Sequence, residues 1–235
     1  MRLEELFKNL GYLAGTIGAQ IRKDGCEGVP LEDLDLTGEP PHEIALMGPA
    51  QVVLSEGDVF RAAVEGGPGS SEVLFSLQDG TLGVTGGEPA TIVRLTLPAP
   101  RKLVLAGSGR MTAAKLARDG TISIAGSGKL EIANIDGGRL KVSIAGSGRL
   151  AVDGEADALD LSIAGSGSCD GEGLTVAKAA VHIAGSGDAI FACNGDVAAH
   201  LMGSGNVIVR GSARCSIHSI GSGMVTCERE KDPTN

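Results

Sequence analysis

The chain has 235 residues and a formal net charge of −9, and only 2% of its residues are aromatic. The negative charge argues against a general nucleic-acid-binding protein, because phosphate backbones are bound by basic surfaces. Five cysteines are too few to hold together a small disulfide-stapled fold.

Residues 1–33 form an N-terminal segment whose apolar side chains recur at helical spacing, which predicts an amphipathic helix over residues 2–22. A secretory signal is not expected, because Glu4 and Glu5 stand where a signal carries positive charge. The uncharged stretch of residues 9–20 is too short to span a bilayer. We expect the helix to cap one end of the fold or, alternatively, to anchor the chain on a membrane surface or a second copy.

Residues 34–99 contain strand-like segments without a clear repeat. These are residues 44–46, 52–54, 59–64, 73–77, 82–84 and 92–97. Gly48 fits the phase of the glycine turns that follow, because apolar residues alternate on both of its sides and Gly107 comes 59 residues later. We therefore predict degenerate coils continuous with the later repeats; a separate small β domain is the alternative.

The phrase Gly-Ser-Gly occurs seven times in residues 100–228 and organises this part of the chain. The first glycines of the copies are Gly107, Gly126, Gly146, Gly165, Gly185, Gly203 and Gly221, spaced by 19, 20, 19, 20, 18 and 18 residues. Apolar residues stand at alternate positions before and after most of these glycines, which is the period of strands. A short strand cannot bury its apolar face alone, so neighbouring repeats must stack.

The repeat predicts an all-β fold: a single-stranded, right-handed parallel β-helix, or β-solenoid, of about 19 residues per coil. Each coil adds one strand spacing of about 4.8 Å to the rod. The seven glycines are expected to form its tight corners. The β-helix domain is predicted to cover residues 34–228, followed by a polar tail over residues 229–235.

Three histidines, His182, His200 and His218, each stand three residues before the glycine of their repeat. They should therefore stack on the outside of successive coils, where neighbouring imidazoles could share a metal ion. A solvated polar face is the alternative, since serines hold this position in earlier coils. No other metal site and no cofactor are expected.

Arg110, Lys129 and Arg149 form a second outward column, a basic stripe over three coils. The stripe could meet an anionic polymer or partner, although a charged, soluble face also explains it.

Cys215 and Cys227 lie six residues before and six residues after Gly221, on inward positions of the final coil. A disulfide between them would close that end of the rod and would imply an oxidising compartment. Two buried free thiols are the alternative.

No catalytic residue is expected. Polysaccharide-cleaving β-helix enzymes need clustered carboxylates, and sugar clefts commonly use aromatic platforms. The aspartates that could supply a pair, Asp153, Asp157, Asp160 and Asp170, are scattered over coil turns.

The passage from Pro41 to Gly66, the phrase Asp79-Gly80-Thr81-Leu82 and the repeated Ile-Ala-Gly-Ser-Gly units resemble the bacterial head GIN domain family, named as putative auto-transporter adhesins. The C-terminal stretch from Ala213 through Cys227 is also similar to members of that family. The resemblance implies a right-handed β-helix, usually in exported or lipid-anchored proteins. It implies no enzymatic activity, so no catalytic residue is carried over.

These observations together favour a non-enzymatic β-helical scaffold, a cell-envelope binding or adhesin-like protein whose partner is another protein or a surface glycan. A self-assembling structural scaffold, like the similarly built bactofilins, is the alternative, and a polysaccharide-active enzyme is the third possibility. We expect neither nucleic-acid binding nor a transmembrane span; oligomers could form through the solenoid ends or the N-terminal helix. The family resemblance predicts a periplasmic or cell-envelope location, whereas the lack of a signal predicts the cytoplasm.

Overall fold

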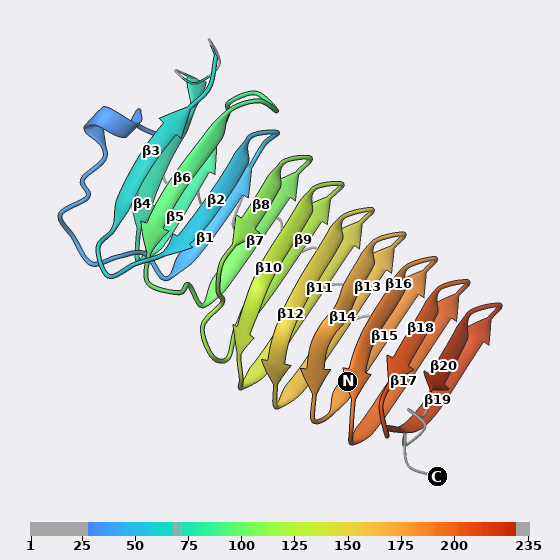
Figure 1. Cartoon of the computed structure of the whole chain (residues 1–235). Coiled ribbons are helices and arrows are strands. Elements are labelled where there is room, and N and C mark those ends of the chain that lie inside the picture. Colours follow the sequence, from blue (N-terminus) through green and yellow to red (C-terminus); the bar gives the residue numbers. More distant parts are fainter. Residues whose placement is uncertain (1–27, 68–69, 71, 229–235) are drawn as a thin grey trace.

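The structure is a computed structural model that describes residues 28–67, 70 and 72–228. It confirms an all-β solenoid, in which successive coils stack along one long axis (Figure 1). The helix predicted for residues 2–22 lies outside the described residues. The structure has a 3₁₀ turn at η1 (Leu31–Asp33), and no helix within the described ranges is long and apolar enough to cross a bilayer.

Two ten-stranded sheets face each other across the core, and each coil contributes one strand to each sheet. In sequence order, the first sheet contains β1 (Glu43–Met47), β4 (Leu74–Gln78), β5 (Thr81–Thr85), β7 (Lys102–Gly107), β9 (Thr121–Gly126), β11 (Arg139–Gly146), β13 (Ala158–Gly165), β15 (Ala179–Gly185), β17 (Asp196–Gly203) and β19 (Arg214–Gly221). The second sheet contains β2 (Gln51–Glu56), β3 (Arg61–Glu65), β6 (Ile92–Leu97), β8 (Arg110–Ala113), β10 (Lys129–Asp136), β12 (Arg149–Ala156), β14 (Ser168–Val176), β16 (Asp188–Cys193), β18 (Asn206–Arg210) and β20 (Met224–Glu228).

The alternating apolar pattern places one side chain in two inside the solenoid. Along β11, for example, Leu140, Val142 and Ile144 are fully buried, and the residues between them face outward. Parallel pairing keeps equivalent residues in register, so Ile144 lies beside Ile124 on one side and Ile163 on the other. The core is therefore a set of aliphatic columns, which explains how the chain folds with so few aromatic residues.

The Gly-Ser-Gly phrases form the corner between the two sheets. Gly165 has φ +117°, a conformation that side-chain-bearing residues rarely adopt. A Cβ atom on Gly165 would lie 2.5 Å from the carbonyl oxygen of Gly146 in the preceding coil. Each corner thus requires glycine both for its backbone angle and for its close contact with the corner before it. Gly48 occupies the same kind of corner, next to Gly107.

The coils of residues 34–99 do not follow the order of the chain, which corrects the expectation of a simple continuation. Strands β1 and β2 lie in phase with β7 and β8, as Gly48 predicted, but on their other side they pair with β5 and β6. The chain returns from β6 to β7 through the short connection of residues 98–101, passing the coil of β1 and β2. Glu43 marks this interleaving, because its carboxylate accepts hydrogen bonds from Lys102 Nζ (2.7 Å) and Thr81 Oγ1 (3.5 Å).

Two further strands turn back at this end of the rod. Strand β4 pairs antiparallel with β5, and β3 pairs antiparallel with β6, so each is the outermost strand of its sheet. The periodicity of residues 59–77 could not reveal this, because alternation is the same in parallel and antiparallel strands.

Candidate binding surfaces

Three histidines line up on the outside of the first sheet and form what we call the histidine column: His182, His200 and His218. Parallel pairing places them directly beside one another, in line with Ser162 of the preceding coil. The ring centroids are 5.1 Å apart for the first pair and 5.0 Å for the second, with interplanar angles of 6° and 19°. The strand spacing thus imposes the stacking, since rings on adjacent parallel strands are held about 4.8 Å apart.

The stacked geometry does not support the predicted metal site. Parallel rings direct their nitrogen atoms side by side instead of toward one point, and among the described residues no group of three His, Cys, Asp or Glu side chains could hold a metal ion. The Nδ1 atom of His182 is buried without a hydrogen-bond partner in the described part of the chain. Burial lowers the pKa of His182, and the neighbouring His200 lowers it further. A neutral imidazole is therefore favoured at the inner end of the column.

A groove of about 480 Å³ runs beside the histidine column across the starts of the strands. Its outward floor consists of small side chains, Ala180, Ala198 and Ser216, and we call it the alanine groove. Three cations lie along its rim: Arg139, Lys178 and Arg214. Arg139 pairs with Asp160 at 3.6 Å and Arg214 pairs with Asp196 at 2.9 Å, whereas Lys178 makes no ion pair with another described residue. The groove is thus a flat, small-residue surface with a rim of mixed charge, on which Lys178 is a cation without an ion pair among the described residues.

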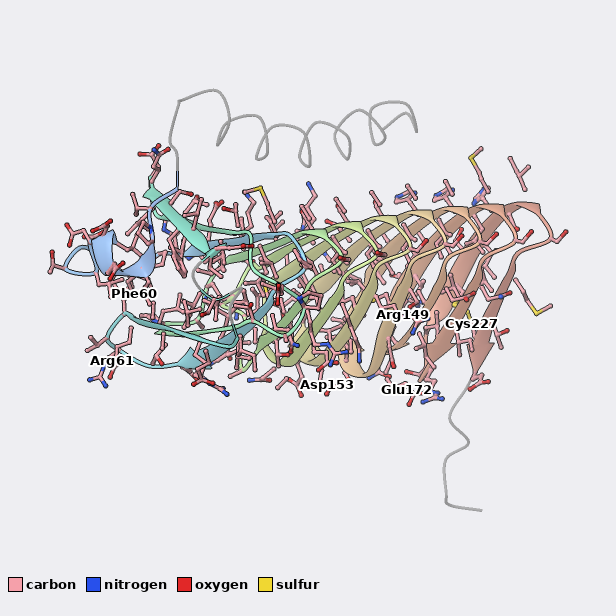
Figure 2. The ribbon with its side chains drawn as sticks, turned by 90° about the horizontal axis from the view of Figure 1, so that it is seen from above. Phe60, Arg61, Arg149, Asp153, Glu172 and Cys227 are labelled. Carbon is pink, nitrogen blue, oxygen red and sulfur yellow. A yellow bond between two sulfur atoms is a disulfide. The ribbon has the colours of Figure 1, made fainter. Side chains whose placement is uncertain are left out.

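The basic column predicted at Arg110, Lys129 and Arg149 is present on the second sheet, where the three residues are direct neighbours in register. Lys129 pairs with Glu131, while Arg110 and Arg149 make no ion pair within the described ranges. The outward positions of β14 and β16 include the acidic residues Asp170, Glu172 and Asp188, of which Glu172 pairs with Arg210 of β18. Figure 2 labels Arg149, Asp153 and Glu172 on this part of the rod. This face is consequently basic in the middle of the rod and acidic further along it.

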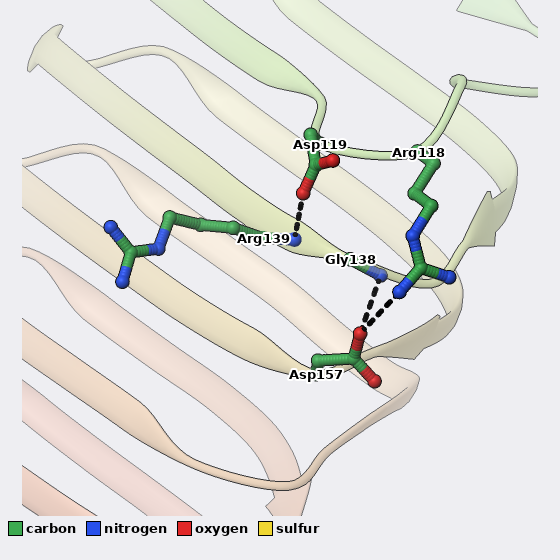
Figure 3. Close-up of polar contacts among 5 residues, drawn as sticks. All are labelled: Arg118, Asp119, Gly138, Arg139 and Asp157. Carbon is green, nitrogen blue, oxygen red and sulfur yellow. Dashed lines mark hydrogen bonds and ion pairs between the residues drawn. The ribbon is translucent and has the colours of Figure 1, made fainter.

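At the edge of the rod, side chains of three successive coils meet at the turns (Figure 3). The Asp157 carboxylate accepts hydrogen bonds from Arg118 Nη2 at 2.8 Å and from the Gly138 amide at 3.2 Å. Asp119 accepts a hydrogen bond from the Arg139 amide at 2.9 Å. These contacts satisfy backbone donors at tight turns, so Asp157 and Asp119 have a structural role.

The four aspartates considered for catalysis are spread over both sheets and a turn. Asp160 lies on the first sheet, whereas Asp153 and Asp170 lie on neighbouring strands of the second. Asp160 is paired with Arg139, and Asp157 with Arg118. Two carboxylates must flank one bond to cleave a glycoside, so Asp160 cannot form such a pair with Asp153 or Asp170 on the other sheet.

The last coil carries a disulfide between Cys215 of β19 and Cys227 of β20, which joins the two sheets covalently. Two other cysteines, Cys169 and Cys193, are free and buried. Burial, followed by the charge of Asp170, raises the pKa of the Cys169 thiol to about 12. This thiol is therefore protonated and unreactive at neutral pH. Cys26 lies outside the described residues.

Sequence reasoning did not predict an apolar surface on the last two coils. Met202 and Ile220 stand where the earlier repeats have alanine, and they are 43% and 72% exposed. On the second sheet, Ile190, Ile208 and Met224 line a groove of about 600 Å³. The sequence does contain a signal for this surface, because in the alignment of the repeats large apolar residues replace small ones at outward positions.

The comparisons with known proteins agree with this architecture. A family model described as "Putative auto-transporter adhesin, head GIN domain" matches residues 40–213. No curated protein sequence matches the chain.

Three solved structures share the fold. A putative adhesin from Bacteroides fragilis has a TM-score of 0.74 at 18% identity and covers 81% of this chain and 93% of its own. A putative adhesin from Parabacteroides merdae has a TM-score of 0.64 at 19% identity, with 82% and 94% covered. A putative lipid binding protein from Parabacteroides distasonis has a TM-score of 0.62 at 19% identity, with the same coverages. At these identities the similarity concerns the fold alone.

Proposed function

The chain belongs to the head GIN domain family of adhesin-like proteins, and from this premise we propose that it is a non-enzymatic binding scaffold of the cell envelope. Its partner is a surface glycan that carries acidic groups, bound along the alanine groove and at the unpaired Lys178 on its rim. A surface protein strand is the second kind of partner that such a groove accommodates.

The observation that carries this proposal is the combination of a flat floor and a charged rim in the alanine groove. Ala180, Ala198 and Ser216 leave room for a ligand to lie across three strands. Lys178, which has no ion-pair partner among the described residues, is available to an acidic group. Because the floor is made of paired strands, the groove exists before the ligand arrives, and binding needs little ordering of the protein.

The disulfide supports the envelope location. Disulfides persist in oxidising compartments and are rare in the cytosol, and Cys227 of the Cys215–Cys227 bridge is exposed to solvent.

The alternative of a bactofilin-like scaffold that polymerises end to end receives less support. Repeated end-to-end stacking of coils favours the same parallel pairing at both ends of the rod. At the N-terminal end, the antiparallel strands β3 and β4 occupy the edges of both sheets, so the parallel coil pattern is interrupted there.

The proposal can be tested by titrating purified bacterial surface polysaccharides, acidic and neutral, against the full chain by biolayer interferometry. An Ala198→Arg variant fills the floor of the groove, and an Ala151→Arg variant makes the same change on the second sheet. We expect the acidic polymers to bind the unchanged protein and the Ala151→Arg variant, and to bind the Ala198→Arg variant at least about tenfold more weakly. Equal binding by both variants would place the site elsewhere.

The non-enzymatic part of the proposal is tested separately. The same polysaccharides are incubated with the protein, and their chain length is followed by size-exclusion chromatography. We expect the chain length to stay constant; shortening that depends on the protein would make it an enzyme.

A further inference from the structure

The two ends of the solenoid are built differently. At the N-terminal end, β3 and β4 turn back on β6 and β5, Val29 bridges the outer strand at Phe75, and η1 packs nearby. At the other end, β19 and β20 each pair on one side only, and no other described residue covers their free edges. We call this C-terminal face of β19 and β20 the open end (Figure 1).

The open end exposes a core position that is buried one coil earlier. Ile217 occupies an inward position and is 45% exposed, whereas Ala199, its neighbour in β17, is fully buried. Two outward apolar residues flank the last corner, Ile220 and Met224, and they are 72% and 63% exposed. The cross-section of the core is thus open to solvent at this end.

The edge strands also lack the features that usually protect a free edge. Natural edges are blunted by proline, inward-pointing charges or bulges. Strand β19 has its cation, Arg214, only at its first residue, and β20 has its anion, Glu228, only at its last. The disulfide meanwhile holds the two strands together in the last coil. A covalently fixed, apolar and unprotected edge is a template for strand addition.

We propose that a second copy of this chain covers the open end, so that two solenoids dock tail to tail as a closed dimer. The two strands of the last coil run in opposite directions, and Arg214 at the start of β19 lies level with Glu228 at the end of β20 because Cys215 and Cys227 are joined. A two-fold axis parallel to the strands therefore brings β19 beside β20 of the second copy in antiparallel orientation.

This orientation is favoured over other two-fold arrangements by its charges. Arg214 already pairs with Asp196, and Glu228 lies 4.0 Å from Arg210, each pair being neighbours in register. Docking places Arg214 beside Glu228 of the second copy. The outward column then reads Asp196, Arg214, Glu228 and Arg210, with alternating sign across the junction and twice in the dimer. The exposed Ile220 and Met224 meet apolar neighbours in the same contact.

The dimer is closed because a two-fold contact uses the open ends of both copies at once. The outer end of each copy is then formed by β3 and β4 instead of a second open end, so the same contact cannot add a third copy. This distinguishes the proposal from a filament. The dimer contact and the alanine groove share β19, because Arg214 lies on the rim of the groove. Ile220 does not line that groove, so Ile220→Lys tests the dimer separately from glycan binding.

The first experiment measures the mass of the full chain by sedimentation equilibrium over a wide concentration range. We compare it with Ile220→Lys at the open end and with Val59→Lys at the opposite end, where Val59 is 60% exposed. We expect a dimer for the unchanged chain and for Val59→Lys, and a dissociation constant at least about tenfold larger for Ile220→Lys. A monomer at every concentration, species that keep growing, or equal weakening by both variants would overturn the proposal.

The second experiment tests the orientation by mixing two charge-reversal variants. Arg214→Glu and Glu228→Arg should each dimerise poorly, because like charges meet twice at the junction. Mixed in equal amounts they should form a heterodimer, since each reversed residue then faces its opposite. If the two substitutions only damaged the fold of each chain, mixing the variants would not restore dimerisation. A mixture that associates no better than the separate variants would exclude this arrangement.

Discussion

The coils of the Gly-Ser-Gly repeats and the coils before them are held together by contacts of different range. In the repeats, each strand pairs with the strand one coil back, so that His200 and His218 are 18 residues apart. In the first part, β1 pairs with strands that begin 38 and 59 residues later in the chain. Local stacking makes each repeat coil dependent on its two neighbours, whereas the interleaved coil joins three segments that are distant in sequence. The difference predicts a rod that is most cooperative at its N-terminal end and frays from its C-terminal end.

The largest effect should come from the interleaved coil. Leu46 is fully buried in β1 between β5 and β7, so Leu46→Ala leaves a cavity that neither neighbour can fill. We expect the free energy of unfolding to fall by about 2–5 kcal/mol, measured by urea denaturation. Ile217→Ala in β19, where the side chain is 45% exposed, is the control and should cost less than about 1 kcal/mol in the monomer. Equal losses at both sites would contradict the comparison.

A corner substitution should have the next largest effect. Gly165→Ala introduces a Cβ atom 2.5 Å from the Gly146 carbonyl oxygen at a backbone φ of +117°. We expect a loss of roughly 2–4 kcal/mol in unfolding free energy, because steric overlap and backbone strain act together. Gly38→Ala, whose Cβ would meet nothing within 4 Å, should change stability little. Thermal unfolding of both variants checks this. An unchanged unfolding temperature for Gly165→Ala would mean that the corner can relax around the added methyl group.

Removal of the disulfide should act on the C-terminal coils alone. The Cys215–Cys227 disulfide closes a short loop around the last corner. Replacing both cysteines by serine frees the last coil and should lower the free energy of unfolding by about 2–3 kcal/mol. Hydrogen exchange is expected to rise in β19 and β20 and to stay unchanged in β1 and β5. Faster exchange throughout the rod would show that its ends unfold together, against the predicted fraying.

The smallest effect should be a dependence of stability on pH that arises from the histidine column. Burial, and then His200, lower the pKa of His182 in the folded state, so the unfolded chain binds the proton more tightly. The stabilisation is present above the unfolded pKa of about 6.5 and is lost as the pH falls from there toward the lower folded value.

Measuring this effect requires unfolding curves between mildly alkaline and mildly acidic pH. Replacing His182 by serine, the residue that Ser162 provides in the preceding coil, should flatten the pH dependence by no more than about 1 kcal/mol. The matched change His218→Ser, at the exposed end of the column, is the control. The same slope in all three proteins would show that the column does not control acid stability.

The repeats were predictable because each carries its own evidence. Seven copies of one corner and a period of two define the coil, and in-register stacking then places the histidine and basic columns without further information. The interleaving of β1 with β5 and β7 could not be predicted, because alternating apolar residues indicate strands but not their partners. The alanine groove was also missed, since it arises from Arg139, Lys178 and Arg214, which are far apart in sequence and meet only along the strand starts.

The interleaved coil has a consequence for the way the protein is made. When β1 and β2 leave the ribosome, the strands that will flank them have not yet been synthesised, and β7 begins 59 residues after β1. At about 5–20 residues per second, the two apolar strands remain without their full set of partners for roughly 3–12 s. The repeats, by contrast, can join the growing rod one coil at a time as they emerge. Folding during synthesis is therefore most prone to misassembly at the first coil, where a chaperone has the longest time to bind.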